Sequence, residues 1–129
     1  MEEKLYRAAL EARQNAYVPY SHFAVGAALL TAEGEIFTGC NVENASYGLS
    51  MCAERNAIFA AVSKGHREIK ALCVVADTKE PVAPCGACRQ VMGEFAIPLI
   101  ILGNCQGKTK NYTWHELLPE AFAAEVLSK

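Results

Sequence analysis

Residues 52–65 are Cys-Ala-Glu-Arg-Asn-Ala-Ile-Phe-Ala-Ala-Val-Ser-Lys-Gly, and the rest of the chain is best understood outward from them. This stretch is dense in alanine and other apolar residues, and a glycine follows it closely. Such a pattern predicts a buried helix over Cys52–Ser63, because glycine readily adopts the left-handed conformation that terminates helices. We expect this helix to lie at the centre of the fold.

Upstream of the central helix, the pattern predicts one helix and a hairpin. Apolar residues recur at three- and four-residue steps from Glu2 to Tyr17, as on one face of an amphipathic helix. A nearly continuous apolar run follows over Phe23–Thr31, then a turn-like Ala-Glu-Gly-Glu, then a second run over Ile36–Val42. These two runs predict strands that form one edge of a sheet.

Downstream of the central helix, strand and helix patterns alternate. Strands are predicted over Ile69–Ala76, Ile97–Leu102 and, more weakly, Thr109–Tyr112, with a short helix over Gly86–Phe95. Alternation of this kind implies parallel strands joined by crossover helices, whereas the hairpin adds antiparallel ones. We therefore expect residues 1–129 to form a single α/β domain.

The composition argues against several classes of function. The chain has 129 residues, of which 52% are hydrophobic and 20% charged, as in an ordinary compact soluble protein. No apolar stretch approaches the ~20 residues of a membrane span, and the acidic start does not resemble a signal peptide, so we expect a cytoplasmic protein without membrane contact. A net charge of −2 favours a small-molecule substrate over a nucleic acid.

The segment Cys85-Gly86-Ala87-Cys88 is a Cys-x-x-Cys motif that directly precedes a helical pattern. One turn of helix brings its two sulfurs to the same side, and a helix N-terminus favours thiolates. Because a cytosolic chain keeps its cysteines reduced, a disulfide is not expected. Taken alone, the motif fits a zinc site, a redox pair or core packing.

Cys52 and Glu54, at the start of the central helix, offer a third sulfur and a carboxylate. Three thiolates suit zinc better than magnesium or calcium, and they leave the fourth tetrahedral position for water. The alternative is a closed structural site with His22 or His115 as fourth ligand. Glu54 argues against that alternative, although by itself it fits a solvated residue in the first helical turn.

Three segments together resemble the cytidine deaminase family. Cys52-Ala53-Glu54 and Pro84-Cys85-Gly86-Ala87-Cys88 resemble the zinc-binding motifs of that family, and residues 37–46, Phe-Thr-Gly-Cys-Asn-Val-Glu-Asn-Ala-Ser, resemble its nucleoside-binding segment. The resemblance spans most of the chain. It implies a three-layer α/β fold with a mixed five-stranded sheet flanked by helices, one zinc ion per subunit, and a homotetramer.

The resemblance also implies a reaction, the hydrolytic deamination of cytidine and 2'-deoxycytidine to uridine and 2'-deoxyuridine in pyrimidine salvage. Zinc held by Cys52, Cys85 and Cys88 would deliver hydroxide to C4, while Glu54 carries protons to N3 and to the departing ammonia. Arg55 would donate a hydrogen bond to a ligand sulfur and offset the charge of three thiolates. Without the motif, Arg55 would be assigned to the surface.

Substrate contacts are implied by the same resemblance. Asn41 and Glu43 would bind the sugar 3'-hydroxyl, and their spacing on extended backbone points both side chains the same way. Phe23 would pack on the pyrimidine, Tyr47 would lie near the 5' end, and Phe122 would reach into a neighbouring subunit's site. Considered individually, the two phenylalanines fit core packing and Asn41 fits a turn.

Four further residues are expected to stay outside the site. Cys40, Cys73 and Cys105 have no spacing that links them to a metal, so reduced packing residues are predicted. His66 follows a glycine at a helix end and is expected to be exposed, with no partner indicated by the sequence.

Two other functions remain open from the sequence. One is a deaminase of the same fold acting on another base, with blasticidin as the nearest competitor and guanine or an RNA-embedded nucleotide further away. The other is a zinc-stabilised binding protein without turnover.

Overall fold

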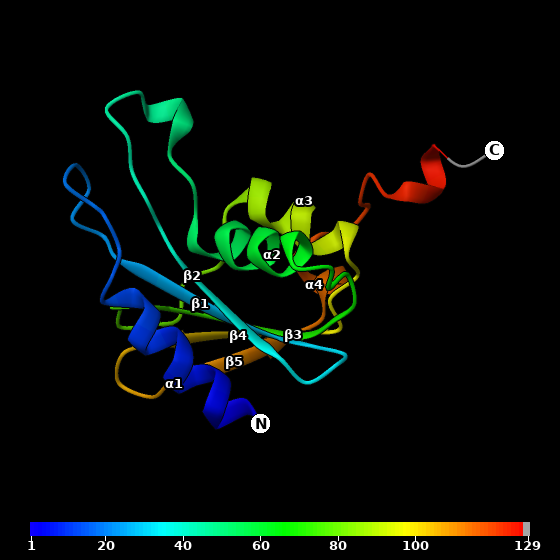
Figure 1. The fold of residues 1–129 in the computed structure, drawn as a ribbon, viewed down its shortest axis with the longest axis horizontal. Coiled ribbons are helices and arrows are strands. Elements are labelled where there is room, and N and C mark those ends of the chain that lie inside the picture. The colour runs from blue at the N-terminus through cyan, green and yellow to red at the C-terminus, as the bar shows by residue number, and fades with distance from the viewer. Residues whose placement is uncertain (128–129) are drawn as a thin grey trace.

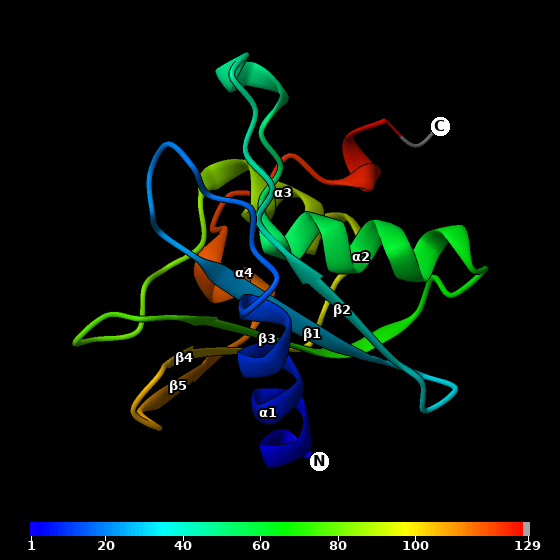
Figure 2. The same cartoon turned by 60° about the vertical axis from the view of Figure 1, so that its left-hand side comes forward.

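The computed structural model describes residues 1–127 and contains a five-stranded sheet with strand order β2-β1-β3-β4-β5 (Figures 1 and 2). The α-helices and strands in chain order are α1 (Glu2–Arg13), β1 (Val25–Thr31), β2 (Ile36–Cys40), α2 (Ala53–Ser63), β3 (Ile69–Ala76), α3 (Gly86–Glu94), β4 (Leu99–Asn104), β5 (Thr109–Tyr112) and α4 (Trp114–Leu117). Short 3-10 helices lie at Tyr47–Leu49, between β2 and α2, and at Ala124–Val126, after α4. Within the described residues no helix is long and apolar enough to cross a membrane.

Helices cover both faces of the sheet, α1 on one face and α2 with α3 on the other (Figure 1). Alternate residues of β1 serve the two faces: Ala27 and Leu29 pack toward α2, whereas Ala28 packs toward α1. The central strands are therefore largely apolar, because both of their faces are mostly buried. This arrangement confirms the predicted three-layer α/β fold.

The sheet is mixed, as predicted. β1 and β2 pair antiparallel, with β2 at the edge, and β1 also pairs antiparallel with β3. β3 and β4 run parallel and are connected through α3, and β5 returns antiparallel to β4. The carboxyl end of β3 therefore leads into the Cys-x-x-Cys segment at the start of α3.

Helix α1 ends at Arg13, although the periodicity predicts a helix to Tyr17. The backbone of Tyr17 pairs instead with the segment that follows β2: its N–H donates to Asn41 O at 3.0 Å, and its carbonyl accepts from Glu43 N at 2.9 Å. Extended pairing of this kind requires the chain to leave the helix first. It also brings the end of α1 beside the segment expected to bind a nucleoside.

Strand β4 begins at Leu99, two positions after the predicted start at Ile97. Ile97 is fully buried, but its N–H donates to Met92 O at 3.3 Å and so closes the end of α3. The strand in turn extends to Asn104, beyond the predicted Leu102. An apolar run alone does not show where a strand begins, because a buried residue that terminates the preceding helix belongs to the same run.

His66 is not the exposed, unpartnered residue that the sequence predicts. Its side chain is 17% exposed, with Nδ1 2.9 Å from Glu33 Oε1 and Nε2 2.9 Å from Glu35 Oε2. The ring also lies 5.3 Å from that of Phe37. The hydrogen bond with Glu33, followed by the charge of Glu35, raises the pKa of His66. The end of α2 is thus tied to the turn between β1 and β2.

The contacts of His66 with Glu33 and Glu35 should make the stability of the fold depend on pH. The folded state raises the pKa of His66 above its ordinary value of 6.5. The contribution of His66 to the free energy of unfolding should therefore be complete below pH 6.5 and should disappear as pH rises through the raised pKa. Urea midpoints of the wild type and His66→Gln should therefore differ more at about pH 5.5 than at about pH 8.5. An equal difference at both pH values, or the same pattern for His115→Gln, would contradict this assignment.

Helix α4 packs against α3 through Trp114. Thr113 and Glu116 form a reciprocal capping box at the start of α4, which fixes the direction in which this short helix leaves β5. A Cβ atom added at Gly93 of α3 would lie 3.1 Å from the Trp114 ring, so a larger residue there would require the ring to shift by a few tenths of an ångström. Trp114 also packs on the core cluster that contains Cys88.

Candidate active site and metal centre

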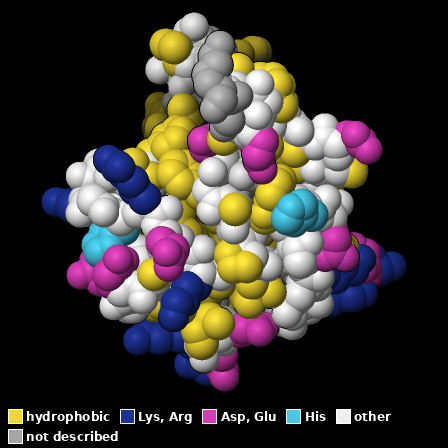
Figure 3. Space-filling view, turned by 90° about the vertical axis from the view of Figure 1, so that its right-hand side faces the viewer, with side chains coloured by type: hydrophobic (Ala, Val, Ile, Leu, Met, Phe, Trp, Pro, Cys, Tyr) yellow, Lys and Arg dark blue, Asp and Glu magenta, His cyan; other side chains and the backbone are white. Residues whose placement is uncertain are grey.

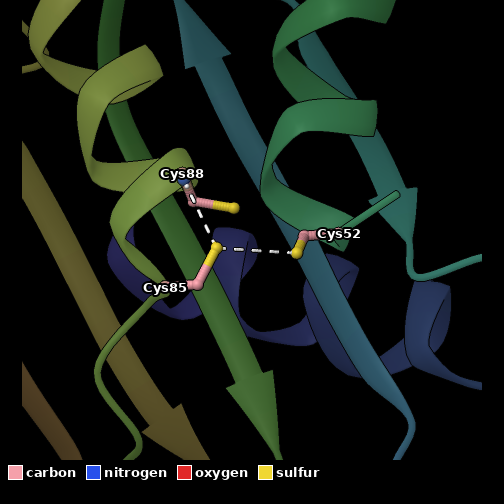
Figure 4. Close-up of side chains that lie close together, drawn as sticks. All are labelled: Cys52, Cys85 and Cys88. Carbon is pink, nitrogen blue, oxygen red and sulfur yellow. Dashed lines mark hydrogen bonds between the residues drawn. The ribbon is translucent and has the colours of Figure 1, made fainter. Parts of the chain in front are cut away.

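The sulfurs of Cys52, Cys85 and Cys88 converge between the N-termini of α2 and α3, within 4.8 Å of one another (Figure 4). Cys52 and Cys85 are the N-cap residues of α2 and α3, and their sulfurs lie 3.8 Å apart. Tetrahedral zinc with Zn–S bonds of about 2.3 Å places ligand sulfurs about 3.8 Å apart. The donor set and the spacing both fit zinc.

Both helix N-termini point at this cluster, as the sequence predicts. The N–H of Cys88 donates to Cys85 Sγ at 3.4 Å, so Cys85 also caps α3. The partial positive charge of a helix N-terminus favours thiolates, the form in which cysteine binds metal. A hydrogen bond from Cys88, together with Arg55, lowers the pKa of Cys52 to about 5. The same bond to Cys52, together with burial, raises the pKa of Cys88.

Arg55 belongs to this centre and is not a surface residue. Its Nη2 donates to Cys52 Sγ at 3.4 Å. This hydrogen bond is the main cause of the raised pKa of Arg55. The Nε atom is buried and has no hydrogen-bond partner among the described residues. Burying an unpaired donor is unfavourable, and attraction between the guanidinium and the thiolate offsets that cost.

Glu54 is buried, with 5% of its surface exposed, and it lines the cleft beside the sulfurs. Burial, reinforced by the charge of Cys52, raises its pKa. A solvated carboxylate in the first turn of α2 would be exposed, so that alternative is wrong. The structure instead places this carboxyl group in the wall of the cleft, beside Cys52 and Cys85.

The fourth-ligand alternative finds no support in the described residues. The cluster that could hold a metal contains the three cysteines and no histidine, so neither His22 nor His115 joins it. Cys52 and Cys85 both line an open cleft. A metal bound here would therefore keep a position that faces this cleft.

The cleft next to the cysteines has a volume of about 330 Å³. Its wall combines apolar residues with a few polar side chains, as is typical of small-molecule sites. The lining residues are Ser21, Phe23, Val25, Asn41, Glu43, Cys52, Ala53, Glu54, Val74, Ala76, Val82, Ala83, Pro84, Cys85 and Gly103.

Asn41 and Glu43 face this same cleft, as their spacing predicts, and both side chains also support the neighbouring loop. Asn41 Nδ2 donates to Phe23 O at 2.8 Å, and its Oδ1 accepts from Val25 N at 2.9 Å. Glu43 Oε1 accepts from the N–H groups of Tyr20 and Ser21, which are two residues of that loop. Asn41 thus does more than form a turn.

The aromatic residues expected at the site are exposed. Phe23, 42% exposed, lines the main cleft. Tyr47, 76% exposed, lines a second cleft that shares Ser21 and Glu43 with the first. Phe122 is 59% exposed and lines neither cleft of this chain; its carbonyl accepts a hydrogen bond from Gln90 Nε2 at 2.7 Å. Core packing is therefore the wrong assignment for both phenylalanines.

Several lining residues were not anticipated from the sequence, among them Ser21, Val82 and Ala83. Ser21 bonds to Glu43, and Val82 and Ala83 form part of the wall just before the Cys-x-x-Cys segment. The position of Val82 and Ala83 beside the metal motif was an available indication. The sequence offered no indication for Ser21, because its partner Glu43 lies 22 residues away along the chain.

The remaining cysteines lie outside the cluster, as predicted. All six cysteines are free thiols. Cys73 is fully buried in the core beneath α1, where burial raises its pKa to about 12, and Cys105 packs against the same cluster. Cys40 is half-buried, which also raises its pKa.

Three converging cysteine sulfurs, a buried carboxyl group beside them and an adjoining cleft are typical of a catalytic zinc site. The family described as "Cytidine and deoxycytidylate deaminase zinc-binding region" matches residues 1–104. Cytidine deaminase from Halalkalibacterium halodurans is 57% identical over 98% of this chain and 97% of its own length. The chain belongs to the cytidine deaminase family.

Solved structures agree with this assignment. The crystal structure of cytidine deaminase from Burkholderia pseudomallei superimposes with a TM-score of 0.91 at 52% identity, covering 95% of this chain and 99% of that one. Blasticidin-S deaminase from Bacillus cereus is more distant, 32% identical over 74% of each chain. Zinc is the cofactor that the family and the cysteine cluster both indicate.

Proposed function

We propose that this protein hydrolyses cytidine and 2'-deoxycytidine to uridine and 2'-deoxyuridine, with release of ammonia. One observation carries the proposal: a single cleft is lined by cysteines of the cluster, by the buried Glu54, and by Asn41 and Glu43. The cleft therefore offers groups for chemistry on a base beside groups for binding a sugar. The 57% identity with a cytidine deaminase supports the same reaction.

The chemistry divides between the metal and the chain. Zinc held by Cys52, Cys85 and Cys88 would supply Lewis acidity, which would lower the pKa of a coordinated water toward neutrality. Glu54 takes a proton from the attacking water on its carboxylate and delivers it to N3 of the cytosine ring. It then moves the second proton of that water, released as the new C4 hydroxyl becomes the C4 carbonyl, to the amino group, and the C4–N bond breaks to release ammonia. Burial of Glu54 keeps bulk water from competing for these protons.

Arg55 compensates for charge at this centre. Three thiolates outweigh the charge of a divalent ion, and the excess negative charge would oppose ionisation of water. The hydrogen bond from Arg55 Nη2 to Cys52 Sγ withdraws electron density from that sulfur.

Asn41 and Glu43 suit a single hydroxyl group. Asn41 uses one amide N–H and the carbonyl oxygen within the chain, which leaves its second N–H without a partner among residues 1–127. The Glu43 carboxylate accepts three hydrogen bonds and retains acceptor capacity. One hydroxyl can donate to Glu43 and accept from Asn41, which suits a 3'-hydroxyl that ribose and 2'-deoxyribose share.

The clefts favour a nucleoside over a nucleotide. Their described lining includes the carboxylates of Glu43 and Glu54 but neither lysine nor arginine. A 5'-phosphate would meet negative charge without a cationic partner, at a cost in free energy.

A comparison of substrates tests the proposal. Loss of ultraviolet absorbance should follow turnover of cytidine and 2'-deoxycytidine at similar kcat/KM, whereas kcat/KM for 3'-deoxycytidine should fall by about 10- to 100-fold, because Asn41 and Glu43 lose their shared partner. Cytidine 5'-monophosphate should be a poor substrate. Turnover of blasticidin S without turnover of cytidine would favour the blasticidin alternative, and turnover of neither would favour a non-catalytic zinc protein.

The active assembly is proposed to be a homotetramer in the cytoplasm, acting in pyrimidine salvage. Phe122 lies on the surface although the family resemblance assigns it to substrate, and hydrophobic side chains gather on the face near the C-terminal segment (Figure 3). Both features fit a face covered by a second copy that receives Phe122. Free thiols at all six cysteines suit a reducing compartment. Sedimentation velocity measures the assembly directly.

A further inference from the structure

Ser21 lies in the loop between α1 and β1 and lines both clefts. Its hydroxyl donates to Glu43 Oε2 and accepts from the backbone N–H of Phe23 at 3.0 Å. A serine hydroxyl has one donor and two acceptor lone pairs, so both of its functions are engaged here. The two partners are the residues placed at the sugar and at the base.

The Glu43 carboxylate depends on this loop for its orientation. Its Oε1 accepts from Tyr20 N at 3.0 Å and from Ser21 N at 3.1 Å, while Oε2 accepts the Ser21 hydroxyl. The hydroxyl is the main cause of the lowered pKa of Glu43. Bonds at both oxygens fix the rotation of the carboxylate, which the backbone donors on Oε1 alone would leave freer.

Phe23 depends on the same loop because its ring lacks the support of a core. Phe23 is 42% exposed and belongs to neither core cluster, so the position of its ring depends on how the backbone is held. Phe23 N–H donates to Ser21 Oγ, and its carbonyl accepts from Asn41 Nδ2 at 2.8 Å. His22, between the two, has φ 58°, an uncommon conformation for a residue other than glycine that folds the chain back.

We infer that Ser21 is a positioning residue that joins Glu43 and Phe23 into one unit, so that binding of the sugar and binding of the base depend on each other. The inference rests on the proposed function. Removing the hydroxyl would leave Phe23 N–H without its partner and Glu43 Oε2 without its donor, and the two side chains could then move independently.

Ser21→Ala should raise KM for cytidine by about tenfold or more, which is the effect of losing a hydrogen bond to a charged group. Its kcat should change by less than about threefold, because the cysteines and Glu54 are untouched. Uridine affinity, measured by titration calorimetry on the zinc-loaded protein, should fall in parallel. Ser21→Thr, which keeps a hydroxyl, should recover both values to within about threefold of the wild type. Ser63→Ala, the same change at an exposed site on α2, should have no effect.

A double-mutant cycle separates positioning from direct contact with the substrate. On a Glu43→Ala background, Ser21→Ala should cost less than it does alone, because part of its effect passes through Glu43. Additive effects, or wild-type KM and uridine affinity in Ser21→Ala, would overturn the inference and leave the proposed function intact. A wild type that binds uridine without converting cytidine would overturn the function, and calorimetry on the variants would still decide the role of Ser21. A wild type that does neither would overturn both.

Discussion

Glu54→Gln should lower kcat for cytidine by about 10²- to 10⁴-fold, the range that general acid–base catalysis contributes. Glutamine fills the same space beside the cysteines but cannot take a proton from water or return one to N3 and the amino group. Its neutral amide also suits a buried site, so the fold and the zinc content should remain those of the wild type. Steady-state kinetics and metal analysis on the same preparation measure both quantities.

The matched control is Glu11→Gln, the same change on the exposed face of α1 and outside the main cleft. It should leave kcat and zinc content unchanged. Wild-type turnover by Glu54→Gln would remove this carboxyl group from the mechanism. Loss of zinc from Glu54→Gln would instead make Glu54 a structural element of the metal centre.

Cys85→Ala should abolish measurable turnover together with bound zinc. The variant loses one of the three sulfurs and also the side chain that caps α3. We expect zinc affinity to fall by well over the roughly 10- to 100-fold that loss of a hydrogen bond to a ligand costs. Because bound metal stabilises only the folded state, the thermal midpoint should fall as well. Metal analysis and thermal unfolding, with and without added zinc, measure these effects.

Cys85→Ser helps to separate loss of the zinc ligand from loss of the helix cap, because serine is a good N-cap residue but a poor zinc ligand. It should lack zinc and activity and yet be more stable than Cys85→Ala. Cys105→Ala, at a half-buried thiol outside the cluster, should keep one zinc ion per chain. A Cys85→Ala protein with full zinc content would refute the assignment of this ligand.

Elements defined by local patterns were predicted accurately from the sequence. The strands Ile69–Ala76 and Thr109–Tyr112 begin and end where their residue patterns do. Two boundaries were not predictable from periodicity. Helix α1 ends early because Tyr17 pairs with the distant segment after β2, and β4 starts late because Ile97 donates a hydrogen bond to the nearby end of α3. Local periodicity of apolar residues contains no information about these hydrogen bonds.

The same distinction applies to the site. The metal cluster was predictable because two of its cysteines lie one helical turn apart and the third begins the neighbouring helix. In contrast, the contacts of His66 with the β1–β2 turn and of Ser21 with Glu43 were not predictable from the sequence. Each joins segments that are distant in sequence, and neither residue type has a spacing rule that predicts its partner.

The close packing of α4 on α3 places Trp114 where its fluorescence can report on α3. Trp114 is the sole tryptophan of the chain, and the ring rests on Gly93 in the helix that begins at the Cys-x-x-Cys segment. Indole emission is sensitive to how tightly the ring is enclosed. Intrinsic fluorescence can therefore follow metal loading of this helix in solution without any attached dye.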